Sequence, residues 1–294
     1  MTMSLPRRRL LRGTAALAGG LGLRVFAAVP VVAEAGPLQR RLRFTLTFVN
    51  PSAQPVDDVR FWCYLPANLD ERQALAALEV SMPHERITDR HGHNVLALKW
   101  DRMPAFAQKV VSLGTTTELR PAAGPAPLAD APAWLAPERF IESDDPAVTA
   151  LAATLRRATP METLRAIYDA ARRNVRDIGY VAEDLGARAA LERHTGDCTE
   201  YADLVVALAR ANGIPARMLG GHVVEADGSP RAIDYHNWAE CHVDGAWRLV
   251  DAQKGNWLAP AQRYVAFRIY RDVASNPIGL AHRYRLDGAL RLSM

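Results

Sequence analysis

Early in the chain, apolar and polar residues alternate with a period of two. Phe44, Leu46 and Phe48 are separated by Thr45 and Thr47. Similar runs, bounded by turn-forming residues, follow at residues 59–65, 95–98, 110–113 and 115–119. A period of two is that of a β-strand, because successive side chains point to opposite faces. Short strands with turns between them predict a small all-β sandwich over residues 36–120.

Beyond residue 140 the apolar residues take the spacing of helices. Thr159-Pro160-Met161-Glu162 has the sequence of a capping box with proline at the first helical position. Apolar residues then recur three and four positions apart, at Leu164, Ile167, Tyr168, Ala171 and Val175. Further helices are expected from about residue 146, over 187–192 and over 198–211.

Strands are expected after the last of these helices, at residues 216–225, 235–243 and 246–251. Helices followed by an antiparallel sheet predict an α+β domain over residues 141–294. Residues 121–140 begin with a stretch rich in proline and alanine, which predicts a linker between this domain and the sandwich.

The first 35 residues have the order of a secretory signal. Paired arginines in the segment 6–12 precede a short apolar run at 13–23, and Ala33-Glu34-Ala35 supplies small residues for cleavage. The arginine pair resembles a twin-arginine signal, so we expect export to the periplasm or beyond. The apolar run is shorter than the roughly 20 residues of a spanning helix, so no stable membrane anchor is expected.

Charge argues against one class of partner, and the cysteine count argues against one class of fold. The 294-residue chain has a formal net charge of +4, and residues 1–35 account for it with five arginines and one glutamate. The near-neutral remainder has little electrostatic attraction for nucleic acid, which is not expected as a partner. Three cysteines are too few for a disulfide scaffold, and the odd count leaves at least one thiol unpaired.

Cys198 is a candidate nucleophile because of its position. It stands in Gly196-Asp197-Cys198-Thr199-Glu200, where the helix over 198–211 is expected to begin. Unpaired backbone N–H groups and the helix dipole favour an anion there, which predicts a lowered thiol pKa. The alternative is a buried cysteine that packs as a small hydrophobe.

A hairpin predicts which groups share a face of the sheet. Asp244-Gly245 is a strong signal for a two-residue turn. Such a turn places Trp238 opposite Asp251 and makes His236 the diagonal neighbour of Asp251 on the same face. A carboxylate beside an imidazole can fix its tautomer and stabilise its protonated form, as an orienter does for a catalytic base. A three-residue loop would break this pairing.

Other histidines could serve instead. His194 lies four residues before Cys198, while His222 and His242 lie on expected strands. His236 could also be a satisfied core histidine, and Asp251 could cap the end of its strand. The sequence pattern alone leaves these alternatives open.

Four segments together resemble a known family. They are residues 196–202, 209–217, 236–240 and 247–251, in the sequences GDCTEYA, ARANGIPAR, HNWAE and WRLVD. Their order and spacing resemble the transglutaminase-like superfamily over roughly residues 142–257. The resemblance implies a papain-like core with a catalytic triad of Cys198, His236 and Asp251, and implies acyl transfer through a thioester. A β-sandwich ahead of the core is also found in that superfamily.

The implied chemistry is attack of the Cys198 thiolate on an amide carbonyl of a protein or peptide substrate. The Cys198 backbone N–H and, as an aromatic donor, Tyr180 are candidates for holding the oxyanion, with Trp238 as a supporting residue. Water as acceptor makes a cysteine peptidase or amidase, and an amine makes a protein-glutamine transamidase. No cofactor is expected.

A different class of protein competes with this interpretation. A non-catalytic protein-binding module could retain the same fold, although an intact triad argues against it. No metal site is expected: His91-Gly92-His93 lacks further ligands nearby, and strand parity places Cys241 on the face opposite His236.

Overall fold

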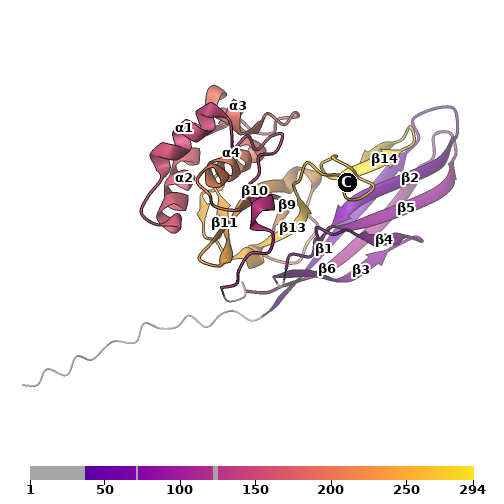
Figure 1. The fold of residues 1–294 in the computed structure, drawn as a ribbon. Helices are drawn as coiled ribbons and strands as arrows, with labels where there is room; N and C mark the ends of the chain where they lie inside the picture. The colour runs from indigo at the N-terminus through magenta and orange to yellow at the C-terminus, as the bar shows by residue number, and fades with distance from the viewer. Residues whose placement is uncertain (1–36, 71, 122–124) are drawn as a thin grey trace, which may run out of the picture. The chain divides into compact units, whose positions relative to one another are not determined.

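The structure is a computed structural model that describes residues 37–70, 72–121 and 125–294. The signal peptide expected over residues 1–35 lies outside the described residues. The described chain is a mixed α+β fold in which strands dominate the first part and helices follow (Figure 1). The α+β class expected from the sequence is therefore confirmed.

Two four-stranded antiparallel sheets form the sandwich. One has the order β15-β1-β6-β3 and the other the order β14-β2-β5-β4. Their bounds are β1 (Leu38–Val49), β2 (Val56–Leu65), β3 (Gln73–Val80), β4 (Glu85–Thr88), β5 (Asn94–Met103), β6 (Gln108–Leu119), β14 (Tyr284–Asp287) and β15 (Arg291–Ser293). Phe48 packs edge-on against both Phe61 and Trp100, with ring centroids 5.0 Å apart in each pair. The alternation read from the sequence thus places these aromatic rings in the core between the sheets.

The C-terminal residues return to the sandwich. Leu286 of β14 lies opposite Phe61 of β2, and Leu292 of β15 lies opposite Phe48 of β1. The sequence pattern alone places all of residues 141–294 in the second domain. These last strands are only four and three residues long, and Arg285, Asp287 and Arg291 in them are charged, so nothing local in them indicates which sheet they join.

Four helices and a five-stranded antiparallel sheet form the second part of the fold. The helices are α1 (Pro146–Leu155), α2 (Pro160–Asn174), α3 (Gly186–Arg193) and α4 (Cys198–Ala211). The sheet has the order β12-β11-β10-β9-β13, with β9 (Ala216–Val223), β10 (Tyr235–Val243), β11 (Ala246–Asp251), β12 (Asn256–Trp257) and β13 (Tyr264–Ile269). Short elements complete it: β7 (Arg176–Asp177) paired with β8 (Thr195–Gly196), and single 3-10 turns at Ala131–Trp134, Ala232–Asp234 and Ala261–Arg263.

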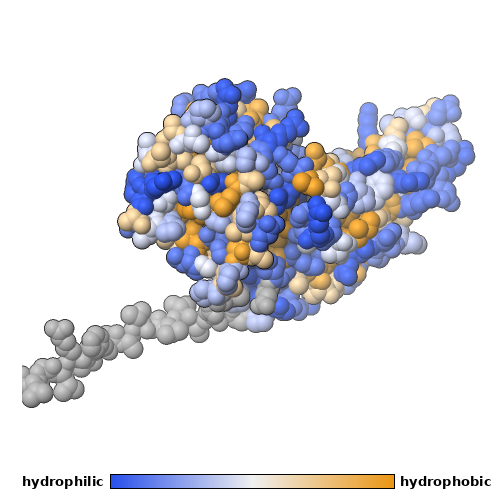
Figure 2. All heavy atoms as spheres, in the orientation of Figure 1, coloured by the Kyte–Doolittle hydropathy of each residue, from blue (hydrophilic) through white to orange (hydrophobic). Residues whose placement is uncertain are grey.

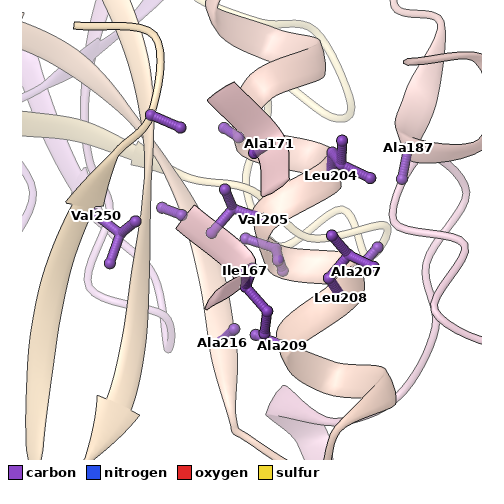
Figure 3. Close-up of a cluster of buried hydrophobic side chains, with 14 of the residues drawn as sticks. Ile167, Ala171, Ala187, Leu204, Val205, Ala207, Leu208, Ala209, Ala216 and Val250 are labelled. Carbon is purple, nitrogen blue, oxygen red and sulfur yellow. The ribbon is translucent and has the colours of Figure 1, made fainter. Parts of the chain in front are cut away.

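Helix α4 is enclosed on all sides. Every residue from 199 to 210 is buried, although the helix includes Glu200, Asp203 and Arg210. Leu204, Val205 and Leu208 pack with Ile167 of α2 and Val250 of β11, as Figure 3 shows. A helix that is apolar around most of its circumference belongs in a protein interior. This burial anchors the start of α4 against the sheet.

Buried polar contacts join the sandwich to the second sheet. Glu240 of β10 accepts hydrogen bonds from Arg72, just before β3, and from Arg217 of β9, each at 2.8 Å. Gln73 donates to the backbone carbonyl of Ala266 on β13 at 2.7 Å and accepts from its N–H at 2.9 Å. On the visible face, hydrophilic residues cover much of the surface and hydrophobic ones form smaller patches between them (Figure 2).

Candidate active site

Helix α4 begins at Cys198, as the sequence predicts. Asp197 is its N-cap residue, and its carboxylate accepts from the backbone N–H of Thr199 at 2.7 Å. The Glu200 carboxylate reaches back to accept from the Asp197 N–H at 2.9 Å, which completes a capping box. These bonds fix the first turn of the helix and hold the thiol at its start.

Gly196 is required by the close approach of that capping box. A Cβ atom at this position would lie 2.4 Å from the Cβ of Glu200. The Glu200 carboxylate also accepts from the N–H of Leu185, so the loop before α3 is tied to the same group. The motif Gly196-Asp197-Cys198-Thr199-Glu200 is therefore one packed unit rather than a set of separate signals.

The hairpin between β10 and β11 has the predicted register. Val243 lies opposite Ala246, and Ala239 lies opposite Val250. The two turn residues have positive φ angles, 53° for Asp244 and 72° for Gly245, as a type I′ turn requires. The prediction of a two-residue turn is confirmed.

His236 and Asp251 lie in direct contact. His236 Nε2 is 2.8 Å from Asp251 Oδ2, and both side chains are buried. The same Asp251 oxygen accepts from the Tyr264 hydroxyl at 2.8 Å, while Oδ1 accepts from the Lys254 backbone N–H at 3.1 Å. With three donors around it, this carboxylate is held as an acceptor and orients the imidazole.

Two histidines share a cavity with the Cys198 thiol. A cavity of about 750 Å³ is lined by Cys198, His236 and Tyr180, and one of about 350 Å³ is lined by Cys198, Tyr180 and His282. Both ring nitrogens of His282 are engaged, Nε2 by Asp184 at 2.6 Å and Nδ1 by the Tyr270 hydroxyl at 3.2 Å. Among contacts of the described residues, Nδ1 of His236 has no partner. His236 is therefore the histidine with a ring nitrogen free to take a proton.

The other histidines considered from the sequence lie elsewhere. His194 is exposed at the end of α3 and bonds the carbonyl of Asn174. His222 is buried among aromatic rings, where desolvation lowers its pKa to about 4. His242 packs edge-on against Trp247 near the turn. None of these three lines a cavity with Cys198.

Trp238 and Tyr180 occupy different kinds of position. Trp238 is 1% exposed and stacks on the His236 ring at a centroid distance of 6.3 Å. Tyr180 is 71% exposed, in the loop between β7 and α3, and lines both cavities beside Cys198. Trp238 thus supports the imidazole from within the core, whereas Tyr180 is open to a ligand.

The thiol pKa differs from the sequence-based expectation. Burial, followed by the Asp197 carboxylate, raises the pKa of Cys198 to about 12. Hydrogen bonding to the Asn237 backbone and the Thr199 side chain opposes this rise, and the Asp251 carboxylate adds a smaller contribution to it. The expectation of a lowered thiol pKa at a helix start is therefore wrong, because desolvation and nearby negative charge outweigh the helix terminus. A thiol in this environment needs an adjacent base to take its proton.

The site also contains residues that the sequence patterns did not indicate. Tyr264 donates to Asp251, Asn237 donates to Thr199 Oγ1 at 3.0 Å, and Asp184 holds His282. Asn237 stands inside the motif HNWAE and could have been singled out from it. Tyr264, Asp184 and His282 lie outside the motifs in the sequence, and the fold brings them to the site. Within the described ranges, no group of three His, Cys, Asp or Glu side chains could hold a metal ion.

The class of the fold follows from these elements. A cysteine at the start of a buried helix faces an antiparallel sheet that carries a histidine and an aspartate, which is the arrangement of papain-like thiol folds. Residues 149–252 match the family model of the Transglutaminase-like superfamily. The second part of this chain therefore has a transglutaminase-like core.

Two solved structures are similar to this chain, and the first of them supports the fold. "A Putative Cysteine Protease from Cytophaga hutchinsonii" is 20% identical with a TM-score of 0.61, over 88% of this chain and 90% of that one. The periplasmic domain of TgpA from Pseudomonas aeruginosa is 20% identical with a TM-score of 0.38, over 71% and 69%. No curated protein sequence matches this chain.

Proposed function

We propose that the protein is an enzyme that transfers acyl groups from protein or peptide amides through a thioester on Cys198. The observation that carries the proposal is the position of the free thiol in one cavity with His236, whose other ring nitrogen is held by Asp251 at 2.8 Å. Nucleophile, base and orienter are the components of a thiol triad.

Proton movement follows from the environment of each group. Because burial raises the pKa of Cys198 to about 12, the thiol loses its proton to His236 as attack on the carbonyl begins. Asp251 stabilises the imidazolium that forms and is itself held by Tyr264 and Lys254. His236 then protonates the departing amine, and water or a second amine opens the thioester.

The cavities around the thiol favour an extended substrate. The cavities of about 750 and 350 Å³ meet at Tyr180, Asp197 and Cys198, so a ligand can pass on both sides of the sulfur. Ile233, 69% exposed, and Tyr180, 71% exposed, offer apolar contacts along this path. Such lining is suited to a peptide chain, and the scissile amide would lie at Cys198.

The test is a mass-spectrometric assay on a glutamine-containing peptide library, with and without an added primary amine. Amide cleavage indicates a peptidase or amidase, and amine incorporation indicates a transamidase. Cys198→Ser should abolish either product, while Cys63→Ser, at a buried position of strand β2, should retain it. Absence of both products, with Cys198 alkylated no faster than a free cysteine, would favour the non-catalytic binding module.

We also propose that the protein is exported with cleavage near Gly36. The paired arginines and Ala33-Glu34-Ala35 support this proposal. The described residues contain no helix long and apolar enough to cross a membrane. N-terminal sequencing of native protein should find a start near residue 36; an intact residue 1–35 segment would contradict export by this route.

A further inference from the structure

Arg283 lies where the two cavities that contain the thiol meet. Like Cys198, it lines both the cavity of about 350 Å³ and the cavity of about 750 Å³. Lys254, the other long cationic side chain in these linings, is exposed and lines only the larger cavity. A charged side chain at the junction can contact a ligand on either side of the sulfur.

The Arg283 side chain is held in a defined orientation. Its Nη1 donates to the backbone carbonyl of Ala232 at 2.8 Å, and its guanidinium lies over the Tyr235 ring, 4.6 Å from the ring centroid. The Arg283 carbonyl accepts from the Tyr64 backbone N–H of strand β2 at 3.1 Å. Because the guanidinium is already ordered, less side-chain entropy is lost when it binds a ligand.

One edge of this guanidinium is open. Among the described residues, Nε and Nη2 of Arg283 have no acceptor, and neither nitrogen is enclosed. The same two nitrogens of Arg285 hold both oxygens of Asp287, at 2.9 and 3.0 Å. An arginine edge of this shape binds a carboxylate through two parallel hydrogen bonds.

The carboxylates around the thiol do not occupy this edge. Four carboxylates line the two cavities, and each contacts another group of the protein. Asp177 accepts from Gln253 and the Gly179 N–H, Asp184 contacts His282, Asp197 accepts from the N–H groups of Val181 and Thr199, and Asp234 pairs with Arg231. None of the four pairs with Arg283, so a carboxylate on a ligand would find its edge free.

We propose that Arg283 binds a carboxylate of the substrate and thereby selects acidic peptides for reaction at Cys198. The carboxylate lies near the scissile amide, either on an aspartate or glutamate side chain or at the C-terminus of the peptide. The inference rests on the proposed acyl transfer and names the substrate class of that site. Arg283 determines specificity and takes no part in proton transfer, which stays with His236.

The sandwich places Arg283 at the thiol. Residues 271–283 contain no helix or strand, and Ser275 and Asn276 tie the middle of this segment to Asp89 in the loop between β4 and β5. Strand β14, which pairs with β2, begins directly after Arg283. The C-terminal return to the sandwich therefore provides a residue that the transglutaminase-like core, matched over 149–252, does not contain.

The first experiment uses reagents that carry an iodoacetyl group on the amino nitrogen of an amino acid. Three pairs each differ in one charge: aspartate against asparagine and glutamate against glutamine, all as C-terminal amides, and alanine with a free carboxylate against its amide. Cys198 forms a thioether with each reagent and releases iodide, so no turnover is needed. The ratio of rates within a pair cancels any change in the reactivity of the thiol itself.

The wild-type protein should favour the acidic member of at least one pair roughly 5- to 20-fold, relative to the same ratio for free cysteine. Arg283→Gln should remove this preference, and Arg283→Lys should keep part of it, because lysine retains the charge but not the two-donor edge. A preference in the aspartate or glutamate pair identifies an acidic side chain. A preference in the alanine pair identifies the chain terminus.

Arg285→Gln is the matched control. It removes the same kind of cation from β14, where Arg285 pairs with Asp287 outside both cavities. Its rate ratios should stay within about 2-fold of the wild-type ratios, as expected when an exposed ion pair is lost. Circular dichroism checks that each variant is folded, and peptide mapping confirms that Cys198 is the residue modified.

Three results would overturn the proposal: no preference in any pair, a preference for the neutral members, or an acidic preference that persists in folded Arg283→Gln. The first two are measured on the wild-type protein and do not depend on the folding of a variant. If the peptide library yields no product but the acidic preference depends on Arg283, the proposed function fails and the carboxylate site stands. If the library yields products without that preference, acyl transfer stands and the site fails.

Discussion

At the scale of single residues, the three cysteines show that environment decides which thiol can act. Cys63 and Cys241 are buried in strands, and burial raises the pKa of both thiols, that of Cys63 to about 12. The pKa of Cys198 is raised to a similar value. What distinguishes Cys198 is its place in the cavity of about 750 Å³ together with His236, which Asp251 holds; Cys63 lines only a cavity of about 60 Å³. Access and a base, rather than a resting thiolate, make it the candidate nucleophile.

His236 and Asp251 should differ in how much activity depends on them. His236→Ala removes the base in both half-reactions and should abolish most of kcat. Asp251→Asn keeps a hydrogen-bonding group but loses the charge, and should cost on the order of 10–10³ in kcat. That loss is smaller than the ~10⁴ known for the corresponding serine-protease change, because a thiol needs less help from its base.

Steady-state kinetics with circular dichroism would measure both effects. Asp234→Asn is the control, since Asp234 lines the same cavity as Cys198 but pairs with exposed Arg231. Its kcat should remain within about 2-fold of the wild-type value, as for a surface change of under roughly 0.5 kcal/mol. Folded Asp251→Asn with wild-type kcat would remove Asp251 from the triad; a loss in Asp234→Asn instead would point to that carboxylate.

At the scale of elements, the β10–β11 hairpin connects a short-range signal to the site. Its two-residue turn determines the register, and the register makes His236 and Asp251 neighbours. The helix α4 makes the corresponding contribution for Cys198 through its capping box. Both features depend on residues close together in sequence, which is why they could be predicted from the pattern.

Substitutions at two glycines should separate backbone strain from steric clash. Gly245 and Gly213 both have positive φ, at 72° and 78°. A Cβ at Gly245 would lie 2.8 Å from the Cβ of Pro125, whereas nothing lies within 4 Å of one at Gly213. Gly213→Ala should lower the free energy of unfolding by about 1 kcal/mol, and Gly245→Ala by about 2–3 kcal/mol.

Urea unfolding would measure the difference between these two variants. Equal losses of unfolding free energy in the two variants would mean that Pro125 moves away from the new Cβ atom without destabilising the protein. Backbone strain at the positive φ angle would then explain both losses. Because neither glycine touches the thiol, folded Gly245→Ala with the hairpin register intact should keep wild-type kcat.

At the scale of the whole molecule, buried charge joins the sandwich to the transglutaminase-like core. Glu240 lies between Arg72 and Arg217, with all three side chains at least nine-tenths buried. Arg72 and Arg217 hold the pKa of the Glu240 carboxyl down at about 2, against the effect of its burial. The ion pair between Arg72 of the sandwich and Glu240 of β10 therefore depends on this carboxylate remaining ionised.

The stability of the protein should fall in acid partly through Glu240. The Glu240 carboxyl has a lower pKa in the folded protein, about 2, than its ordinary value of 4.5. Its contribution to stability is therefore fully present above pH 4.5 and is lost as the pH falls toward about 2. Glu240→Gln leaves two buried guanidinium groups short of a counter-charge and should cost roughly 3–5 kcal/mol at neutral pH. The cost should shrink as the pH falls below 4.5.

Chemical denaturation at several pH values would follow this difference. Asp169→Asn, which breaks an exposed pair with Arg165, is the control and should change stability by less than about 1 kcal/mol. A Glu240→Gln penalty that stays constant from pH 7 to pH 3 would contradict the role of the ionised carboxylate.

The sequence by itself determined the elements and the principal motifs. Period-two and helical patterns predicted the early strands and the four helices, the Asp244-Gly245 turn predicted the hairpin register, and Cys198 was expected at a helix start. These features depend on backbone and side-chain preferences over a few residues, so they can be predicted from the sequence. The resemblance in four motifs extended this to the family of the core.

The tertiary structure alone decided the environment of the site. Packing of the whole chain gives Cys198 the burial that raises its pKa. It also brings Tyr264 to Asp251 and His282 to Tyr270. Only packing returns β14 and β15 to the sandwich. Desolvation and contacts between distant segments depend on how the whole chain folds, because no local preference of a residue specifies which remote residue will cover it.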